Sequence, residues 1–130
     1  MGYPKVEVAA QRLRNLNPYI NVEPLPISVN QANAEELVRA MDVVFDGLES
    51  MKARYAINRA CIKIGVLDVF GAAITTTGNV STIVPGRTAC LECFYGGLDD
   101  KKLPKCGVVG VHPSLVNIIA SLEVSEAIRI

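Results

Sequence analysis

The stretch Val43-Val44-Phe45-Asp46-Gly47-Leu48-Glu49-Ser50 determines the fold class of this 130-residue chain. Its first three residues form a short continuous apolar run, which is typical of a buried parallel strand. Asp46 and Gly47 end that strand, and Ser50 is a residue type that caps helices, so we expect a helix from there to Ile64. Gly65 provides the stop at the carboxyl end of the helix. A buried strand followed directly by a helix predicts an α/β domain.

On the carboxyl side of this unit, the pattern returns to strand. Residues 69–74 form a second apolar run, and we expect it to pair in parallel with residues 43–46 through the intervening helix. Thr77-Gly78-Asn79 is typical of a turn, so residues 80–84 are predicted to add an antiparallel strand at the sheet edge. The fold class that follows is a Rossmann-like, doubly wound α/β sheet, present here as an incomplete, carboxyl-terminal portion.

Three further elements are predicted on the amino side. Apolar residues at helical spacing indicate a helix over residues 6–16, which Asn17-Pro18 ends. Alternating apolar residues over 20–29 predict a half-buried strand, although two prolines interrupt it. Residues 34–41 are predicted to form a short helix opened by a capping box of Asn33 and Glu36.

The region from residue 86 to residue 113 lacks periodicity and is rich in Gly, Pro, Lys and Cys. A segment of this length without regular structure is unusual in a compact domain, unless it is functional or held by a metal. After it, Ser114 is predicted to cap a last helix, whose apolar stripe contains Leu115, Ile118, Ile119, Leu122 and Ile128. That helix has no Gly or Pro stop before Ile130, which favours the interpretation that the chain is a piece of a longer protein.

Composition excludes several classes of protein. Half of the residues are hydrophobic, a fifth are charged, and the formal net charge is zero, so no basic surface points to a nucleic-acid partner. The apolar runs end well before the ~20 residues that a membrane-spanning helix needs. The first residues lead into an amphipathic pattern without a signal-peptide core, so we expect a cytoplasmic protein. Cys90 and Cys93 form a Cys-x-x-Cys pair, which in a reducing compartment indicates metal or redox chemistry.

Four segments, in order, resemble the ThiF/MoeB/HesA family of ATP-dependent enzymes that activate ubiquitin-like proteins. They are Gly2-Tyr3-Pro4-Lys5-Val6-Glu7 with Leu16-Asn17-Pro18; Asp46-Gly47-Leu48-Glu49-Ser50 with Arg54 and Asn58; Gly71-Ala72-Ala73 with Gly78; and Cys90-Leu91-Glu92-Cys93 with Cys106, Gly110-Val111 and the last helix. The resemblance covers residues 1–130 as a single partial adenylation domain. It implies that the Gly-rich nucleotide loop and a second Cys-x-x-Cys pair lie outside this chain.

The resemblance implies an ATP site with magnesium. The family's phosphate-contacting lysine matches Lys5, although a solvated helix lysine is the alternative. The family's metal-binding aspartate matches Glu49, where this chain has a longer side chain, and Asp46 is a second acid that could share the task. A simple turn and a favourable acid at a helix start are the alternatives for these two residues. Arg54 and Asn58, four residues apart, either bracket the nucleotide or form a buried structural pair.

The cysteines have implied roles as well. Cys90 and Cys93 match the first half of the family's structural zinc site. Cys106 matches a crossover-loop cysteine that in some members forms a sulfur link with the carrier protein, and nearby lysines would favour its thiolate. A bystander thiol is the alternative for Cys106. Cys61 is expected to be a core thiol, His112 a structural residue, and Gly71 and Gly78 sites of close packing.

Three functional hypotheses follow. The first is a fragment of an ATP-dependent adenylyltransferase that activates the C-terminal Gly-Gly of a ubiquitin-like or sulfur-carrier protein and works as a homodimer. The second is a non-catalytic module that binds such a protein or dimerises. The third, half of a nucleotide-binding oxidoreductase, fits the crossover cysteines less well. Carrier-dependent pyrophosphate exchange distinguishes the first from the second, and nicotinamide binding would support the third.

Overall fold

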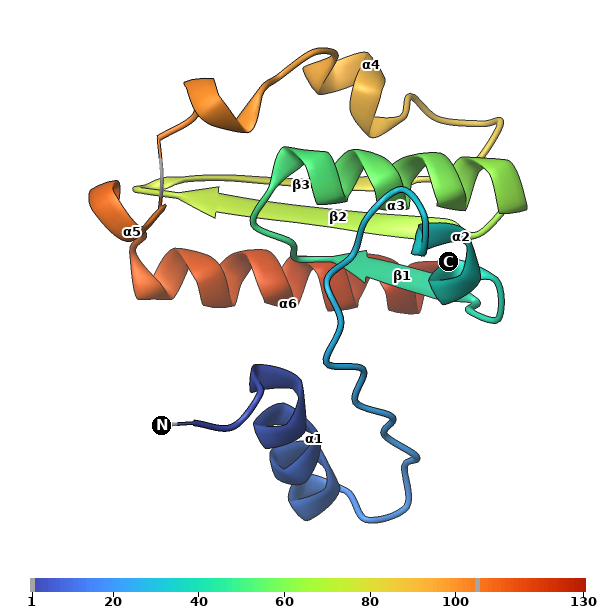
Figure 1. The fold of residues 1–130 in the computed structure, drawn as a ribbon, viewed down its shortest axis with the longest axis vertical. Helices are drawn as coiled ribbons and strands as arrows, with labels where there is room; N and C mark the ends of the chain where they lie inside the picture. The colour runs from blue at the N-terminus through green and yellow to red at the C-terminus, as the bar shows by residue number, and fades with distance from the viewer. Residues whose placement is uncertain (1, 105) are drawn as a thin grey trace.

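The computed structural model describes residues 2–104 and 106–130, with Cys106 described by its backbone only. Its centre is a three-stranded sheet in the order β1 (Val43–Asp46), β2 (Leu67–Ile74), β3 (Thr77–Ile83). β1 and β2 run parallel, with Asp46 beside Phe70, whereas β2 and β3 form an antiparallel hairpin. The mixed sheet with helices on both faces confirms the predicted α/β class and the antiparallel edge strand (Figure 1).

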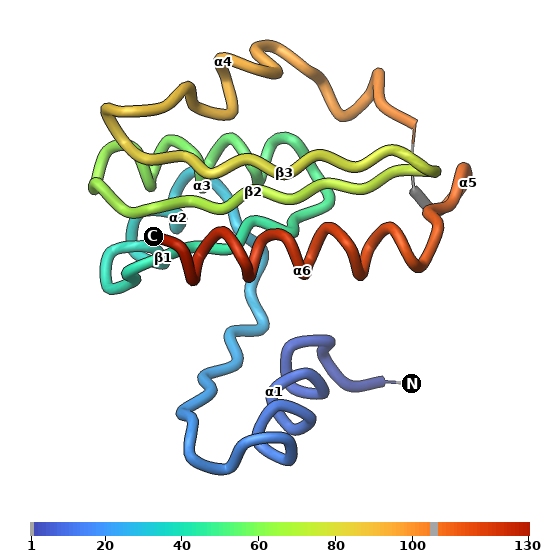
Figure 2. Tube along the Cα trace, turned by 180° about the vertical axis from the view of Figure 1, so that it is seen from behind, coloured from blue at the N-terminus to red at the C-terminus, as the bar shows by residue number. Residues whose placement is uncertain are grey.

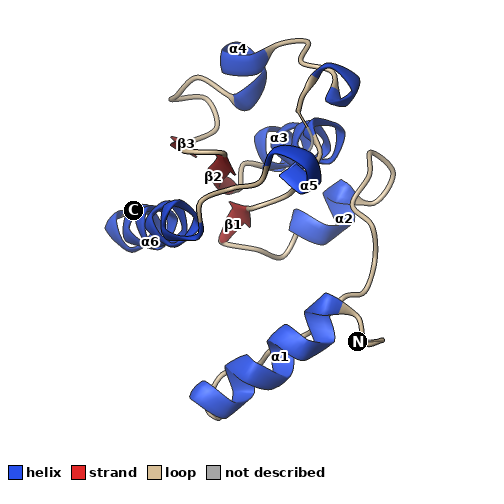
Figure 3. Ribbon diagram, turned by 90° about the vertical axis from the view of Figure 1, so that its left-hand side faces the viewer, coloured by secondary structure: helices blue, strands red, loops and turns tan. Residues whose placement is uncertain are grey.

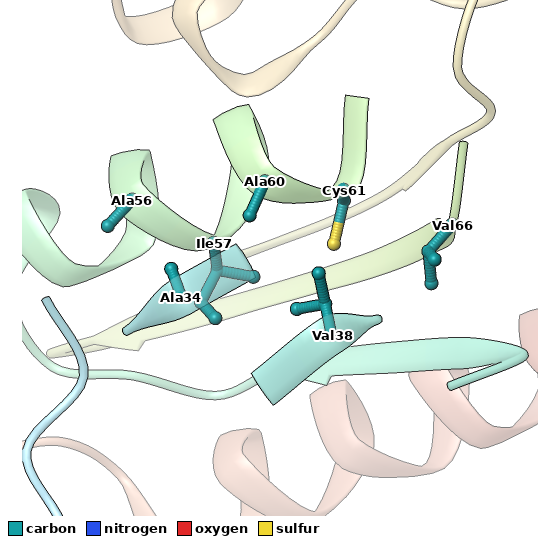
Figure 4. Packing of buried hydrophobic residues seen from close by; sticks show 7 residues of the cluster. All are labelled: Ala34, Val38, Ala56, Ile57, Ala60, Cys61 and Val66. Atoms are coloured by element: carbon teal, nitrogen blue, oxygen red, sulfur yellow. The ribbon is translucent and has the colours of Figure 1, made fainter. Parts of the chain in front are cut away.

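Helices cover the two faces of the sheet unequally. α3 (Met51–Ile64) and α2 (Ala34–Val38) lie on one face, and α6 (Pro113–Arg129) lies along the other (Figure 3). Between α2 and α3 lies a closely packed group of small and branched side chains (Figure 4): Ala34, Val38, Ala56, Ile57, Ala60, Cys61 and Val66. Small residues let the two helices approach closely, so this cluster fixes α3 above the parallel strands.

A second cluster joins α3 to the crossover segment that follows β3. Met51, Phe70, Ile83 and Leu91 are buried together, and Tyr95 packs against them with its ring 5.9 Å from that of Phe70. Leu91 begins α4 (Leu91–Tyr95), a short helix above α3. The segment is thereby attached to the same face of the sheet that α3 covers.

Both ends of α3 form as predicted. The Ser50 hydroxyl accepts a hydrogen bond from the Ala53 N–H at 3.1 Å, which is an N-cap contact. Gly65 adopts the left-handed conformation, with φ of 88°, and its N–H donates to the Cys61 carbonyl. Cys61 is fully buried, as expected for a core thiol.

Two predictions on the amino side are wrong. Residues 20–29 form no strand, because no neighbouring strand pairs with them and Pro24 and Pro26 have no N–H to donate. Asn33 and Glu36 form no capping box, since Asn33 uses its side chain in the preceding turn. Its Oδ1 accepts from the Asn30 N–H at 2.8 Å and its Nδ2 donates to the Ser28 carbonyl at 2.9 Å. α2 is correspondingly short and ends at Val38.

The β2–β3 turn is tighter than predicted. It consists of Thr75 and Thr76, and residues 77–79 already belong to β3. Thr75 has φ of 51°, which is uncommon for a β-branched residue. Two backbone hydrogen bonds hold it, from the Thr75 N–H to the Gly110 carbonyl and from the His112 N–H to the Thr75 carbonyl.

The region 86–113 is less irregular than predicted. Besides α4 it contains a 3-10 turn at Asp100–Lys102 and α5 at Cys106–Val109. The last helix begins two residues earlier than predicted, with His112 at the N-cap and Pro113 in the first turn, so Ser114 is not its cap. The predicted apolar stripe divides between two faces: Ile119 is buried against the sheet, whereas Ile118, Leu122 and Ile128 are exposed.

α1 (Lys5–Leu16) forms as predicted and lies apart from the sheet (Figures 1 and 2). The extended residues between α1 and α2 connect it to the rest of the chain. Among the described residues, no helix combines the length and apolar character that crossing a bilayer requires.

Candidate functional site

The candidate site begins where the parallel strand β1 ends. Open parallel sheets bind ligands at the carboxyl ends of their strands, and Asp46 is the last residue of β1. It is only 1% exposed. Its Oδ1 accepts hydrogen bonds from the Leu48 N–H at 3.0 Å and from Arg54 at 3.2 Å, whereas its Oδ2 has no partner among the described residues. Asp46 therefore shapes the turn from inside the protein.

Arg54 links three elements at this point. From α3, its Nη1 donates to the carbonyl of Asp46 at 3.1 Å, to the Asp46 carboxylate at 3.2 Å and to the carbonyl of Gly71 in β2 at 2.9 Å. Its guanidinium lies 4.8 Å from the centre of the Phe70 ring. The two backbone bonds tie the end of β1 and the middle of β2 to the start of α3, so Arg54 and Asp46 act as a clamp on the turn.

Glu49 lies on the turn that this clamp holds. It is exposed and stands one residue before the Ser50 cap, at the positive end of the α3 dipole. Its carboxylate is thus available to a ligand, whereas that of Asp46 faces the interior. Mg²⁺ prefers oxygen ligands, and of these two acids only Glu49 has a solvent-exposed carboxylate that a metal ion can reach.

Asn58 lies one helical turn beyond Arg54 and is fully buried. Its Oδ1 accepts a hydrogen bond from the Leu91 N–H at 3.0 Å, which joins α3 to the start of α4. Its Nδ2 makes no hydrogen bond of ordinary geometry within the described part of the chain. Arg54 and Asn58 both direct hydrogen bonds to protein groups in this structure.

Two further acids surround the clamp, and sequence reasoning missed both. Asp68 in β2 is fully buried and neither of its oxygens has a partner among the described residues. Burial, together with the negative charges of Asp46 and Glu123, raises the pKa of Asp68 to about 7, although Arg54 opposes the shift. Burial likewise raises the pKa values of Asp46 and Glu123. The signal for Asp68 in the sequence was a lone acid directly before the predicted strand, between Leu67 and Val69.

Lys5 stands at the first position of α1 and is exposed. In the described structure it makes no ion pair with the acids of the turn, and α1 lies apart from them. The structure therefore brings Asp46, Glu49, Arg54 and Asn58 together and leaves Lys5 separate.

The Cys90–Cys93 pair lies at the start of α4, with its sulfurs 3.5 Å apart. Two thiolates on one tetrahedral zinc are about 3.8 Å apart, given Zn–S bonds of about 2.3 Å, so the pair fits half of such a site. Partial burial opposes ionisation of Cys90, but hydrogen bonds from Cys93 and the Glu92 backbone lower its pKa. Groups of three or more potential metal ligands do not occur among the described residues. The side chain of Cys106 lies outside the described residues.

Cys61 and the glycines Gly71 and Gly78 have structural roles. Burial raises the pKa of the Cys61 thiol to about 12, so it stays protonated in the core. A Cβ on Gly71 would lie 2.3 Å from the Glu123 carboxyl carbon, and one on Gly78 would lie 2.5 Å from Ile119. Both glycines allow α6 to approach the sheet closely, as expected.

A groove of about 320 Å³ opens beside this site, between the hairpin and α4. Its lining contains Phe70, Asn79, Val80, Ser81, Phe94 and Tyr95. Because the ring of Phe70 also supports Arg54, the groove and the clamp share a wall.

Comparisons with known proteins agree with this architecture. The sequence profile of the ThiF family matches residues 1–130. The chain is 32% identical over 131 residues to the SAMP-activating enzyme E1 of Haloferax volcanii, matching all of this chain and 48% of that enzyme. It is 32% identical to the sulfur carrier protein adenylyltransferase of Thermus thermophilus, matching all of this chain and 50% of that protein. Identity to the molybdopterin-synthase adenylyltransferase of Escherichia coli is 30%, matching 99% of this chain and 52% of that protein.

Solved structures show the same fold. Escherichia coli MccB with succinimide superposes with a TM-score of 0.80 at 17% identity, matching 99% of this chain and 40% of MccB. MccB with ATP gives a TM-score of 0.77 at 18% identity, with the same shares of the two chains. The chain spans about half the length of the three curated relatives named above.

Proposed function

The chain belongs to the ThiF family, and from this membership we propose that it is part of an ATP-dependent adenylyltransferase. The proposed substrate is the C-terminal Gly-Gly carboxylate of a ubiquitin-like or sulfur-carrier protein. A carboxylate oxygen attacks the α-phosphorus of ATP, the bond between the α- and β-phosphates breaks, and acyl-adenylate and pyrophosphate result. The names of relatives that act on such carriers support this substrate class.

The observation that carries the proposal is the turn at the end of β1. The buried Asp46–Arg54 pair fixes a turn whose next acid, Glu49, is exposed at the ligand-binding edge of the sheet. We propose that Glu49 helps to hold Mg²⁺ against the triphosphate, where the metal would offset the charge that develops on the leaving pyrophosphate. Asp46 and Arg54 contribute by positioning that turn, and Asn58 by fixing α3 to the crossover segment.

Lys5 completes the proposed ATP site in the whole protein. Its ammonium is suited to a triphosphate, and the exposed face of α1 leaves it free to meet a nucleotide that other parts of the protein also hold.

The groove lined by Phe70 and Ser81 is the proposed path for the carrier's tail. A Gly-Gly tail has no side chains, so a narrow groove can accommodate it. Substituting Ser81 with Trp should then raise the KM for the carrier; an unchanged KM would contradict this placement.

Zinc and Cys106 are separate parts of the proposal. Cys90 and Cys93 would supply two of four zinc ligands, with the other two from residues outside this chain. Elemental analysis of the full-length protein should find about one zinc per chain, and its absence would remove this assignment. The Cys106 thiolate would attack the carbonyl carbon of the carrier's acyl-adenylate and displace AMP, which gives a thioester through sulfur. A gel would show this link as a thiol-sensitive species that Cys106→Ala lacks.

We propose that the protein is cytoplasmic and acts as a homodimer. A reducing compartment would keep the three thiols of Cys61, Cys90 and Cys93 free, as they are in the structure. Several apolar side chains on α6 are exposed, and we propose that a second copy covers some of them: Val116, Ile118, Leu122 and Val124.

The test of the reaction is carrier-dependent ATP–pyrophosphate exchange by the full-length protein. Glu49→Gln should lower the exchange rate by about 10²-fold or more at saturating Mg²⁺, because one preorganised metal ligand is lost. Asp42→Asn, an exposed acid just before β1, is the matched control and should leave the rate unchanged. Carrier binding without exchange would instead favour the non-catalytic binding module. A rate that falls less than tenfold in Glu49→Gln but strongly in Asp46→Asn would move the metal to Asp46.

A further inference from the structure

The crossover segment after β3 follows one face of α3 in the reverse direction. At the amino end of α3, Asp100 accepts two backbone hydrogen bonds: Oδ1 from the Met51 N–H at 2.6 Å and Oδ2 from the Lys52 N–H at 3.2 Å. Asp100 comes 48 or more residues later in the chain than these two amides. The cap that it forms is therefore a tertiary contact and not a local one.

The other contacts continue along α3 toward its carboxyl end. The Tyr55 hydroxyl donates to the carbonyl of Tyr95, the Asn58 carbonyl oxygen accepts from the Leu91 N–H, and Arg59 pairs with Glu92. The α3 partners are spaced at about one helical turn, so they share one face. As the residue numbers increase along α3, those of the partners in the crossover segment decrease, from 100 to 95 and then to 91 and 92.

We propose that residues 91–102 form a strap latched along α3, and that Asp100 is a positioning residue that couples this strap to the Glu49–Ser50 turn. The contact of Asp100 is charge-assisted and lies at the positive end of the helix dipole. By contrast, the pair at the opposite end is open to solvent, with side-chain exposures of 52% for Arg59 and 36% for Glu92. Such a pair contributes little, so the end at Asp100 is the one that holds the turn.

The strap is coupled to the turn because Asp100 is the acceptor for two of the first three backbone amides of α3. The first three amides of the helix are all taken: those of Met51 and Lys52 by Asp100, and that of Ala53 by Ser50. If the strap lifts, two of these three amides lose their acceptor, and the turn just before them loses its support. The position of Glu49 thereby depends on whether the strap is closed. This consequence for catalysis rests on the proposed function; the latch itself does not.

Two isosteric variants test the latch. Asp100→Asn removes one charge and one acceptor oxygen at the start of α3. Asp99→Asn removes the same charge from the same strap and keeps an oxygen for the Lys101 N–H that Asp99 caps. In the full-length protein, hydrogen–deuterium exchange at Met51 and Lys52 should accelerate about fivefold or more in Asp100→Asn. In Asp99→Asn it should stay within twofold. An unchanged rate of hydrogen–deuterium exchange in β2 would show that the fold is intact. Equal rates at Met51 and Lys52 in the two variants would overturn the latch.

Kinetics then distinguish positioning from a purely structural cap. Asp100→Asn should lower the kcat of ATP–pyrophosphate exchange on the order of tenfold and leave the KM for the carrier unchanged, because a displaced turn misplaces the metal ligand. Asp99→Asn should keep the wild-type kcat. Faster amide exchange with an unchanged kcat would overturn the positioning role. If the wild-type protein has no ATP–pyrophosphate exchange activity, the proposed function is contradicted. Hydrogen–deuterium exchange at Met51 and Lys52 would still decide whether the latch exists.

Discussion

Asp68 is the residue that burial places under most electrostatic stress. Its carboxylate is fully buried, has no hydrogen-bond partner among the described residues and stands near Asp46 and Glu123, whose charges the Arg54 guanidinium offsets only in part. A buried charge without a partner is costly, so the neutral acid is favoured and the pKa of Asp68 is raised to about 7. The neighbouring acids have raised pKa values for the same reason.

The sign of the pH dependence follows from this shift. An unfolded aspartate has a pKa of about 3.9, so between about pH 4 and pH 7 the folded state binds more protons than the unfolded state. The free energy of unfolding should therefore fall as the pH rises through this window and level off above it. The contribution of Asp68 is on the order of a few kcal/mol, and the raised pKa values of Asp46 and Glu123 act in the same direction.

Asp68→Asn tests this prediction, because the amide keeps the shape and cannot ionise. Relative to the wild type, the variant should gain stability on going from pH 5 to pH 8, as measured by urea denaturation at the two pH values. The exposed acid Asp42, replaced by Asn, is the control and should show no such difference. If Asp68→Asn changes stability equally at both pH values, the raised pKa is wrong.

At the scale of elements, close contact between α6 and the hairpin depends on Gly78. A Cβ at this position would lie 2.5 Å from Cδ1 of Ile119 and 3.2 Å from Cδ1 of Leu115. Both side chains come from the face of α6 that covers β3, so the helix would have to move outward or the Ile119 side chain would have to leave its rotamer.

Gly78→Ala should therefore lower the free energy of unfolding by about 1–3 kcal/mol, read from the urea midpoint. Gly47→Ala is the control, because its Cβ meets no atom within 4 Å, and it should change stability by less than about 0.5 kcal/mol. Adding Ile119→Val to Gly78→Ala should recover part of the loss by removing the methyl group that clashes. Equal effects of the two glycine substitutions would contradict the packing of α6 on β3.

The elements also show how far sequence reasoning reached. Local signals are sufficient at α3, where the Ser50 cap and the left-handed Gly65 determine both ends. They fail at residues 20–29, whose alternation has no strand to pair with, and at the Thr75 turn, where tertiary bonds to Gly110 and His112 hold a β-branched residue at positive φ. The turn at Asp46 was predictable as the end of a parallel strand, but the burial of Asp46, the Asp68 cluster and the Asp100 cap depend on contacts between distant parts of the chain.

For the molecule as a whole, the exposed apolar side chains of α6 are a surface that a partner can cover. Exposure on α6 differs sharply between adjacent residues: Ile119 is 8% exposed against the sheet, whereas Ile118 is 55% exposed. Val116, Leu122 and Val124 are further exposed apolar side chains of α6. Ile118 and Leu122, four residues apart, lie next to each other on the helix, and exposed apolar side chains that adjoin are typical of a protein–protein interface.

Substitutions at the two adjacent isoleucines separate folding from association. Ile119→Ala should cost about 2–5 kcal/mol in unfolding free energy, because it leaves a cavity between α6 and the sheet. Ile118→Lys should change stability by less than about 0.5 kcal/mol, because the side chain already meets solvent, yet it should weaken the proposed homodimer by placing a charge in its apolar contact. Sedimentation of the full-length protein at several concentrations measures the second effect. A dimer that withstands Ile118→Lys combined with Leu122→Lys does not use this face of α6, and its contact would have to lie on another surface.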